Sequence, residues 1–178
     1  MSDWSVTCCF TGHRPEKLPW GTDERDPRCL ALKQSMEREI ERLYRDGCRH
    51  FITGMARGVD LYFAEAALAV KERYPLLTLE AAIPFRGQAD RWSEGDRQRW
   101  QRVREACDKE TLVQEEYDRG CMHRRDRYMV DRAHIILAVF DGTPGGTRYT
   151  LDYAMRRRLE VRLFDLNRPE EPATRLTV

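Results

Sequence analysis

The sequence lacks the features that define several large classes of protein. No apolar run approaches the roughly 20 residues that a helix needs to cross a bilayer. The opening Met1-Ser2-Asp3-Trp4 has no basic segment followed by a long apolar stretch, so we expect no secretion signal. The six cysteines form no CxxC pair and the four histidines show no ligand spacing, so neither zinc nor a disulfide framework is indicated. We therefore expect a cytoplasmic protein with reduced thiols, no membrane partner and no metal site.

An excess of charge of either sign is also missing. Lys and Arg total 31 against 30 for Asp and Glu, a formal charge of +1, which argues against nucleic acid as a partner. The 41% apolar fraction is enough to bury a core, and 178 residues suit one domain. We expect a Rossmann-like nucleotide-binding domain over residues 1–167 and an irregular tail over 168–178. The oligomeric state stays open, a homo-oligomer included.

Short apolar strands alternate with amphipathic helices along the chain. Leu32, Met36, Ile40 and Leu43 recur at helical spacing after a helix start at Asp26-Pro27. The strands are expected at 5–10, 49–53, 76–83, 110–113, 134–140 and 161–164. Helices are expected from 26 to about 47, over 59–73 and 121–133, from the Gly-Gly-Thr run to about 158, with one or two within 88–106. This order predicts an α/β fold: a single Rossmann-like domain, with a mostly parallel sheet and helices on both faces.

Three loops of unusual composition follow expected strands, at residues 11–15, 54–60 and 142–147. In an open parallel sheet, ligands bind beyond the carboxyl ends of the strands, where glycines and free helix amides favour phosphate. A tight turn alone would explain any one of these loops, but three on one edge favour a ligand site. Neither GK[ST] nor GxGxxG is present, which disfavours a P-loop ATPase, a kinase and a standard dehydrogenase.

Charged side chains near these loops are the first candidates for contact with a ligand. Arg14, Arg57 and Arg125 are suited to clamping phosphate with planar bidentate contacts. Asp60, close to a helix start, either caps that helix or accepts a hydrogen bond from a ribose or base. The positive end of the helix is expected to lower its pKa, which suits Asp60 to hydrogen bonding and not to acid catalysis.

Taken in order, five motifs carry a family resemblance. They are Thr-Gly-His-Arg-Pro at 11–15, Thr-Gly-Met-Ala-Arg-Gly-Val-Asp at 53–60, Ile-Pro-Phe at 83–85 with Gln88 and Trp92, Arg-Asp-Arg-Tyr-Met-Val-Asp at 125–131, and Phe-Asp-Gly-Thr-Pro-Gly-Gly-Thr at 140–147. From about residue 5 to 165 the chain resembles the bacterial YpsA-like family of the SLOG superfamily. Other branches of that superfamily are the DprA/Smf DNA-processing proteins and the LOG-type phosphoribohydrolases.

The resemblance implies a Rossmann-type fold with a pocket for a nucleotide-derived ligand such as ADP-ribose or an NAD-related molecule. It points to these ligand-binding positions: Thr11, Gly12, Arg14, Gly54, Gly58, Asp60, Gly145, Gly146 and Thr147. Two departures matter. Asp126 stands where the family commonly has Asn, and Thr150 stands where the LOG branch has its catalytic Glu. An N-glycosidic hydrolase needs a carboxylate there, so this substitution weakens the enzyme hypothesis.

Three functions therefore remain open. The leading hypothesis is a sensor or regulatory module that binds a nucleotide-like small molecule. The second is a nucleotide N-glycosidase, or phosphoribohydrolase-like enzyme, in which Asp60, Asp126 or Asp152 replaces the missing Glu. The third is single-stranded DNA binding of the DprA type, which needs a basic groove with stacking aromatics; the arginines at 124–125 and 156–158 are the local patches available to it.

Overall fold

A computed structural model describes residues 6–176. Residues 1–5, with the start of the first expected strand and the segment inspected for a secretion signal, lie outside the described range, as do residues 177–178. The described residues form one sheet of strand order β4-β3-β2-β1-β5-β6-β7, parallel except for β7. The strands are β1 Val6–Thr11, β2 Cys48–Thr53, β3 Thr78–Ile83, β4 Lys109–Leu112, β5 Ile135–Val139, β6 Glu160–Phe164 and β7 Thr174–Arg175.

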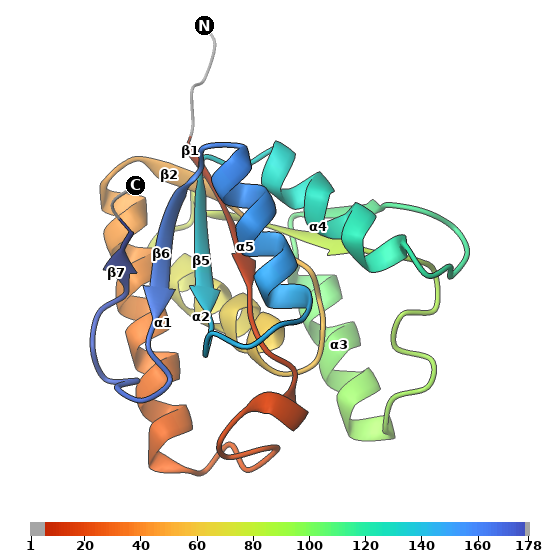
Figure 1. Ribbon diagram of the computed structural model, residues 1–178, viewed down its shortest axis with the longest axis horizontal. Helices are drawn as coiled ribbons and strands as arrows, with labels where there is room; N and C mark the ends of the chain where they lie inside the picture. Colours follow the sequence, from red (N-terminus) through yellow and green to blue (C-terminus); the bar gives the residue numbers. More distant parts are fainter. Residues whose placement is uncertain (1–5, 177–178) are drawn as a thin grey trace, which may run out of the picture.

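The helices cover both faces of this sheet (Figure 1). They are the 3-10 turn η1 Pro15–Lys17 and the helices α1 Pro27–Arg45, α2 Val59–Arg73, α3 Glu94–Ala106, α4 Cys121–Asp131 and α5 Gly146–Arg156. The first three α-helices pack together on one face, and α4 packs beside α5 on the other. The predicted fold class, a single Rossmann-like α/β domain, is confirmed.

Local sequence explains where α1 begins and which side of it is buried. The side chain of Asp26 accepts a hydrogen bond from the Arg28 backbone amide at 2.8 Å, and Pro27 occupies the first helical position. Leu32, Met36 and Ile40 are fully buried against α2 and the sheet. The helical spacing seen in the sequence is therefore the core-facing stripe of α1.

The sheet separates two hydrophobic layers because successive side chains of a strand point to opposite faces. Phe10 faces α2, where its ring stacks on Phe63 with a centroid distance of 4.2 Å. Its neighbour Cys9 faces the other layer, together with Ile136 and Leu151. All six cysteines are free thiols, and within residues 6–176 no helix is long and apolar enough to cross a membrane.

Three segments differ from what the sequence predicts. Residues 15–17 form the turn η1 at the end of the first expected loop, and residues 88–106 contain one helix, α3, that begins only at Glu94. The tail expected to be irregular contains β7, which pairs antiparallel with β6. It pairs there because β6 would otherwise leave an edge of backbone groups without partners. The tail also docks on α1, where the hydroxyl of Ser35 donates to the Pro169 carbonyl at 2.7 Å.

Candidate functional site

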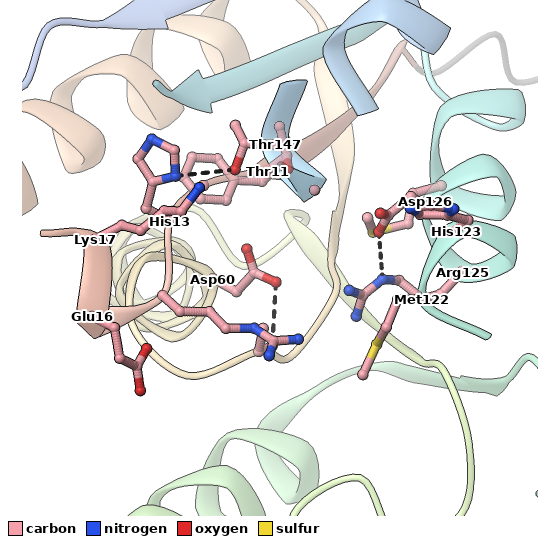
Figure 2. Close-up of a pocket in the computed structure, with 16 residues that line it drawn as sticks. Thr11, His13, Glu16, Lys17, Asp60, Met122, His123, Arg125, Asp126 and Thr147 are labelled. Carbon is pink, nitrogen blue, oxygen red and sulfur yellow. Dashed lines mark hydrogen bonds and ion pairs between the residues drawn. The ribbon is translucent and has the colours of Figure 1, made fainter. Parts of the chain in front are cut away.

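A pocket lies beyond the carboxyl ends of the central strands, where the strand order reverses. The chain proceeds from β1 to β4 in one direction and then returns to place β5 on the other side of β1. Loops diverge at such a switch point and leave a crevice. The pocket has a volume of about 350 Å³, and its walls are the loop after β1, the start of α2 and the first turns of α4 and α5 (Figure 2).

Most of the residues predicted for the site meet in this pocket. Those that line it are Thr11, Gly12, Arg14, Asp60, Arg125, Gly146 and Thr147. Four others, Gly54, Arg57, Gly58 and Gly145, are not among its lining residues. Arg57, expected as a phosphate clamp, instead pairs with Glu16 at 2.7 Å, with its guanidinium carbon 5.9 Å from the ring centre of Trp92.

The glycines of the second loop make room for protein groups. A Cβ atom on Gly54 would lie 2.6 Å from Nη1 of Arg125, whose guanidinium donates to the Gly54 carbonyl. The same carbonyl accepts a hydrogen bond from Nε2 of Gln88 at 3.2 Å. Gly58 has φ +85°, and a Cβ there would lie 2.9 Å from the carbonyl oxygen of His13. These two glycines therefore let the second loop pack against α4 and against the first loop.

A buried charge cluster forms the floor of the site. Arg125, Asp126 and Asp60 are only 5%, 7% and 5% exposed. Nε of Arg125 donates to Oδ1 of Asp126 at 2.7 Å, and Thr150 donates its hydroxyl proton to Oδ2 of Asp126 at 3.0 Å. Thr150 is the position at which the resemblance implies a Glu in the hydrolase branch. The carboxylate of Asp126 thus reaches from α4 toward the place on α5 where that Glu would stand.

The expectation that Asp60 has a lowered pKa is wrong. Burial raises the pKa of Asp60 to about 6, although Arg125 and the Ala56 amide, which donates at 3.2 Å, oppose the shift; the nearby Asp126 adds to it. The loss of hydration outweighs the helix terminus because the side chain is almost entirely shielded from water. Asp60 consequently exchanges protons near neutral pH, a property suited to acid–base chemistry.

His13, which the sequence does not place in the binding set, holds two loops together at the pocket wall. Its Nε2 lies 3.0 Å from Oδ1 of Asp141. Its Nδ1 lies 3.4 Å from Oγ1 of Thr147, a contact that Figure 2 shows. Burial lowers the pKa of His13, which favours the neutral ring, although Asp141 opposes this shift. In one tautomer the ring donates to Asp141 and accepts from Thr147, so it links the loop after β1 to the loop before α5.

Two further features of the pocket are not evident from sequence patterns. Lys17, on η1, lines the pocket and donates to the Pro144 carbonyl at 2.9 Å. Met122 and His123 come from the first turn of α4, and the His123 ring stacks on Tyr149 at a centroid distance of 3.8 Å. A lysine in a Pro-rich loop and a histidine on a helix carry no distinctive signal in a single sequence.

The fold and this pocket define a class: Rossmann-type α/β proteins with a polar site at the sheet's switch point. The model of the YspA SLOG family, called YpsA, matches residues 8–165. The chain therefore belongs to the YspA SLOG family, as the motifs predict.

Relatives in sequence cover most of the chain. The Bacillus subtilis SPbeta prophage-derived protein YoqJ is 30% identical over 156 residues, which are 80% of this chain and 91% of the relative. A UPF0398 protein of Halalkalibacterium halodurans is 27% identical over 153 residues, covering 84% of this chain and 80% of its own.

Relatives in structure share the fold at low sequence identity. DNA processing protein A (DprA) from Streptococcus pneumoniae superimposes with a TM-score of 0.59 at 15% identity, covering 89% of this chain. The match spans half (50%) of that DprA chain. The Helicobacter pylori DprA, whose structure is described as showing a single-stranded DNA binding mode, gives a TM-score of 0.58 at 14% identity. The match covers 89% of this chain and 64% of that DprA chain. With DNA-processing proteins among these relatives, the expectation against a nucleic-acid partner is not supported.

Proposed function

We propose that the pocket binds a phosphate-bearing, nucleotide-derived ligand of the ADP-ribose or NAD type, and that the protein acts as a sensor or regulatory module. The observation that carries this proposal is the combination of cations and a helix N-terminus on one side of the pocket with Met122 and the His123 ring on the other. A volume of about 350 Å³ lies within the usual range for small-molecule sites.

Phosphate is best accommodated beside the loop after β1 and the start of α5. Arg14 lines the pocket, is exposed, and forms no ion pair with any described residue. Gly146 and Thr147 form the first turn of α5, whose free backbone amides favour an anion. Lys17 adds a second positive charge at the same wall. These groups together supply the charge and the donors that a diphosphate requires.

The base and ribose fit the opposite wall. Figure 2 places Met122 and His123 across the pocket from His13 and Lys17. A ring stacked on the exposed His123 would continue the His123–Tyr149 stack. Asp60, between the two walls in Figure 2, is then placed to hydrogen-bond a ribose hydroxyl.

Replacing Arg14 with alanine tests the phosphate contact. We expect Arg14→Ala to weaken ADP-ribose binding by about 1.5–3 kcal/mol, roughly tenfold to hundredfold, because a charge-assisted hydrogen bond is lost. Isothermal titration calorimetry at low salt measures the dissociation constant. Arg25→Ala is the matched control: Arg25 is also exposed, lies in the same segment before α1 and does not line the pocket. An unchanged affinity in Arg14→Ala would remove Arg14 from the site.

A second function is favoured by the two carboxyl groups in the pocket. With a pKa near 6, Asp60 is available as a general acid toward a leaving base, whereas Asp126 is held by Arg125 and Thr150. An N-glycosidic hydrolase uses such a pair, one to protonate the leaving group and one to stabilise the positive charge on the sugar. Asp152, the third carboxyl considered, does not line the pocket and pairs with Arg148 at 3.2 Å.

Chromatography of the protein incubated with NAD, ADP-ribose and nucleoside monophosphates separates the two functions. We expect at least one compound to bind and no free base to appear, since the LOG-type Glu is replaced by Thr150. Asp60→Asn should then leave the chromatogram unchanged. Free base that disappears in Asp60→Asn would overturn the sensor proposal and establish a hydrolase with Asp60 as its acid.

A further inference from the structure

Positive charge is concentrated on the two helices that cover one face of the sheet and on the residues that flank them. Residues 119–132 and 146–158 contain nine arginines, of which Arg125 is buried, and three aspartates, a net charge of +6. The whole chain carries +1, so the remaining residues carry −5. The near-neutral total therefore conceals a strongly asymmetric distribution. Such an asymmetry attracts polyanions to one face of the molecule.

On that face, the seam between α4 and α5 alternates arginine and aromatic side chains. His123, Arg127 and Asp131 follow one another at intervals of four residues, so they share one side of α4. Nη1 of Arg127 donates to the Tyr149 hydroxyl at 2.9 Å, and the Tyr153 hydroxyl donates to Asp131 at 2.8 Å. His123 and Asp131 are exposed and Arg127 is half-buried, so this row of side chains is accessible to solvent.

The seam joins two hollows. At one end, near the first turns of α4 and α5, is the stacked pair His123–Tyr149, and His123 also lines the nucleotide pocket. At the other end, where both helices finish, a second hollow of about 230 Å³ is lined by residues that include Arg156, Arg157 and Arg158. Arg157 pairs with Asp131 at 3.1 Å, whereas Arg156 and Arg158 are exposed and form no ion pair with any residue in 6–176. The guanidinium carbon of Arg156 lies 5.9 Å from the ring centre of Tyr153.

We propose that the α4/α5 seam binds a single-stranded nucleic acid, with one nucleotide near the pocket and the following phosphates directed toward Arg156 and Arg158. Guanidinium groups neutralise phosphates, and ring faces stack on bases without regard to sequence. The 11 residues of α5 span about 16 Å. At about 3.4 Å per stacked nucleotide, the seam accommodates roughly five nucleotides, which about four phosphates connect. Because guanidinium groups and ring faces do not depend on base sequence or on a 2′-hydroxyl, the seam should accept DNA and RNA alike.

Fluorescence anisotropy with labelled oligodeoxythymidylate and oligouridylate of about twelve nucleotides tests this proposal. We expect both to bind at low salt, with a log–log salt slope of about −3 for about four phosphates. The variant Arg156→Glu/Arg158→Glu should weaken binding at least about tenfold and bring the slope closer to zero by about 1.4. The control Arg97→Glu/Arg102→Glu makes the same change of net charge at two exposed arginines of α3, on the other face. It should change affinity less than about twofold.

The outcomes also distinguish this inference from the proposed function. ADP-ribose should stabilise the Arg156→Glu/Arg158→Glu variant as much as the wild type in a thermal-shift assay, because neither arginine lines the nucleotide pocket. The proposal would be overturned if both double variants lost oligonucleotide binding to the same extent. It would also be overturned if the wild-type protein bound neither oligonucleotide at low salt. Binding to phosphatidylserine vesicles with no binding to either oligonucleotide would overturn it too, since the occupant would then be a membrane surface. None of these outcomes would contradict the proposal that the pocket binds ADP-ribose.

Discussion

Replacement of Arg125 by methionine is expected to lower the free energy of unfolding by about 3–5 kcal/mol at pH 7, because it leaves buried carboxylates without their cation. Methionine keeps most of the side-chain length while removing the charge and its donors. Arg125 is 5% exposed, donates to Asp126 at 2.7 Å and also donates to the Gly54 carbonyl. The change therefore removes the cation near Asp126 on α4 and Asp60 on α2, and the hydrogen-bond donor to the Gly54 carbonyl.

The loss should depend on pH in a defined direction. Arg125 at present lowers the pKa of Asp60, which burial nevertheless raises to about 6. Without Arg125 that pKa rises further, so the native state holds a proton that the unfolded state, with its ordinary pKa near 3.8, releases. Stability then increases as the pH falls from 7 toward 4, and the deficit of Arg125→Met should shrink.

Urea unfolding at pH 7 and pH 5 measures this difference. Arg124→Met provides the control at the neighbouring position, because Arg124 pairs with the exposed Asp118 at the surface. We expect Arg124→Met to cost less than about 1 kcal/mol at both pH values. If Arg125→Met lost as little free energy of unfolding as the control, or lost more at pH 5 than at pH 7, Arg125 would not be the cation that stabilises the buried carboxylates.

Replacing Gly58 with alanine is expected to destabilise the protein by about 3 kcal/mol and to weaken ADP-ribose binding through displacement of the first loop. The backbone of Gly58 has φ +85° and ψ −128°, a conformation that residues with a Cβ adopt only under strain. The new Cβ would also lie 2.9 Å from the His13 carbonyl oxygen and from Cδ of Pro15. Strain and crowding each cost on the order of 1–3 kcal/mol.

Gly47→Ala separates backbone strain from crowding by the new Cβ atom. Gly47 has φ +106°, and a Cβ there would meet nothing within 4 Å. We expect this control to lose about 1 kcal/mol and to bind ADP-ribose normally. Thermal unfolding and calorimetry of both variants make the comparison. If Gly58→Ala behaves like Gly47→Ala in both assays, the contact between the first two loops does not shape the pocket.

Much of the fold could be read from local patterns. The bounds expected for the helix at 59–73 coincide with those of α2, and the Asp26-Pro27 start of α1 is observed. The parallel direction of most strands and the helices on both faces follow from the alternation of strands and helices, because parallel strands need helical crossovers. The strand order itself is seen only in the structure. The two-residue strand β7 was not predictable from propensity, since it exists only because β6 offers an unpaired edge.

The candidate site was predictable in its backbone and less so in its side chains. Glycine-rich loops at strand ends mark the edge of the sheet, and Thr11, Gly12 and Gly146 from these loops line one pocket. The link from His13 to Asp141 spans 128 residues, and no local pattern indicates it. The role of Arg57 was also hidden, because its partner Glu16 lies on the turn η1 that the sequence did not predict.

The sequence by itself determined the family, the order of the elements and the strand ends at which loops meet, because these depend on residue types at fixed spacing along the chain. Tertiary structure decided the chemistry. It raised the pKa of Asp60 by burying a carboxyl that sequence position alone would place at a helix start with a lowered pKa. It also turned a chain of net charge +1 into one with a basic α4/α5 face, because packing two arginine-rich helices side by side gathers charges that composition averages away.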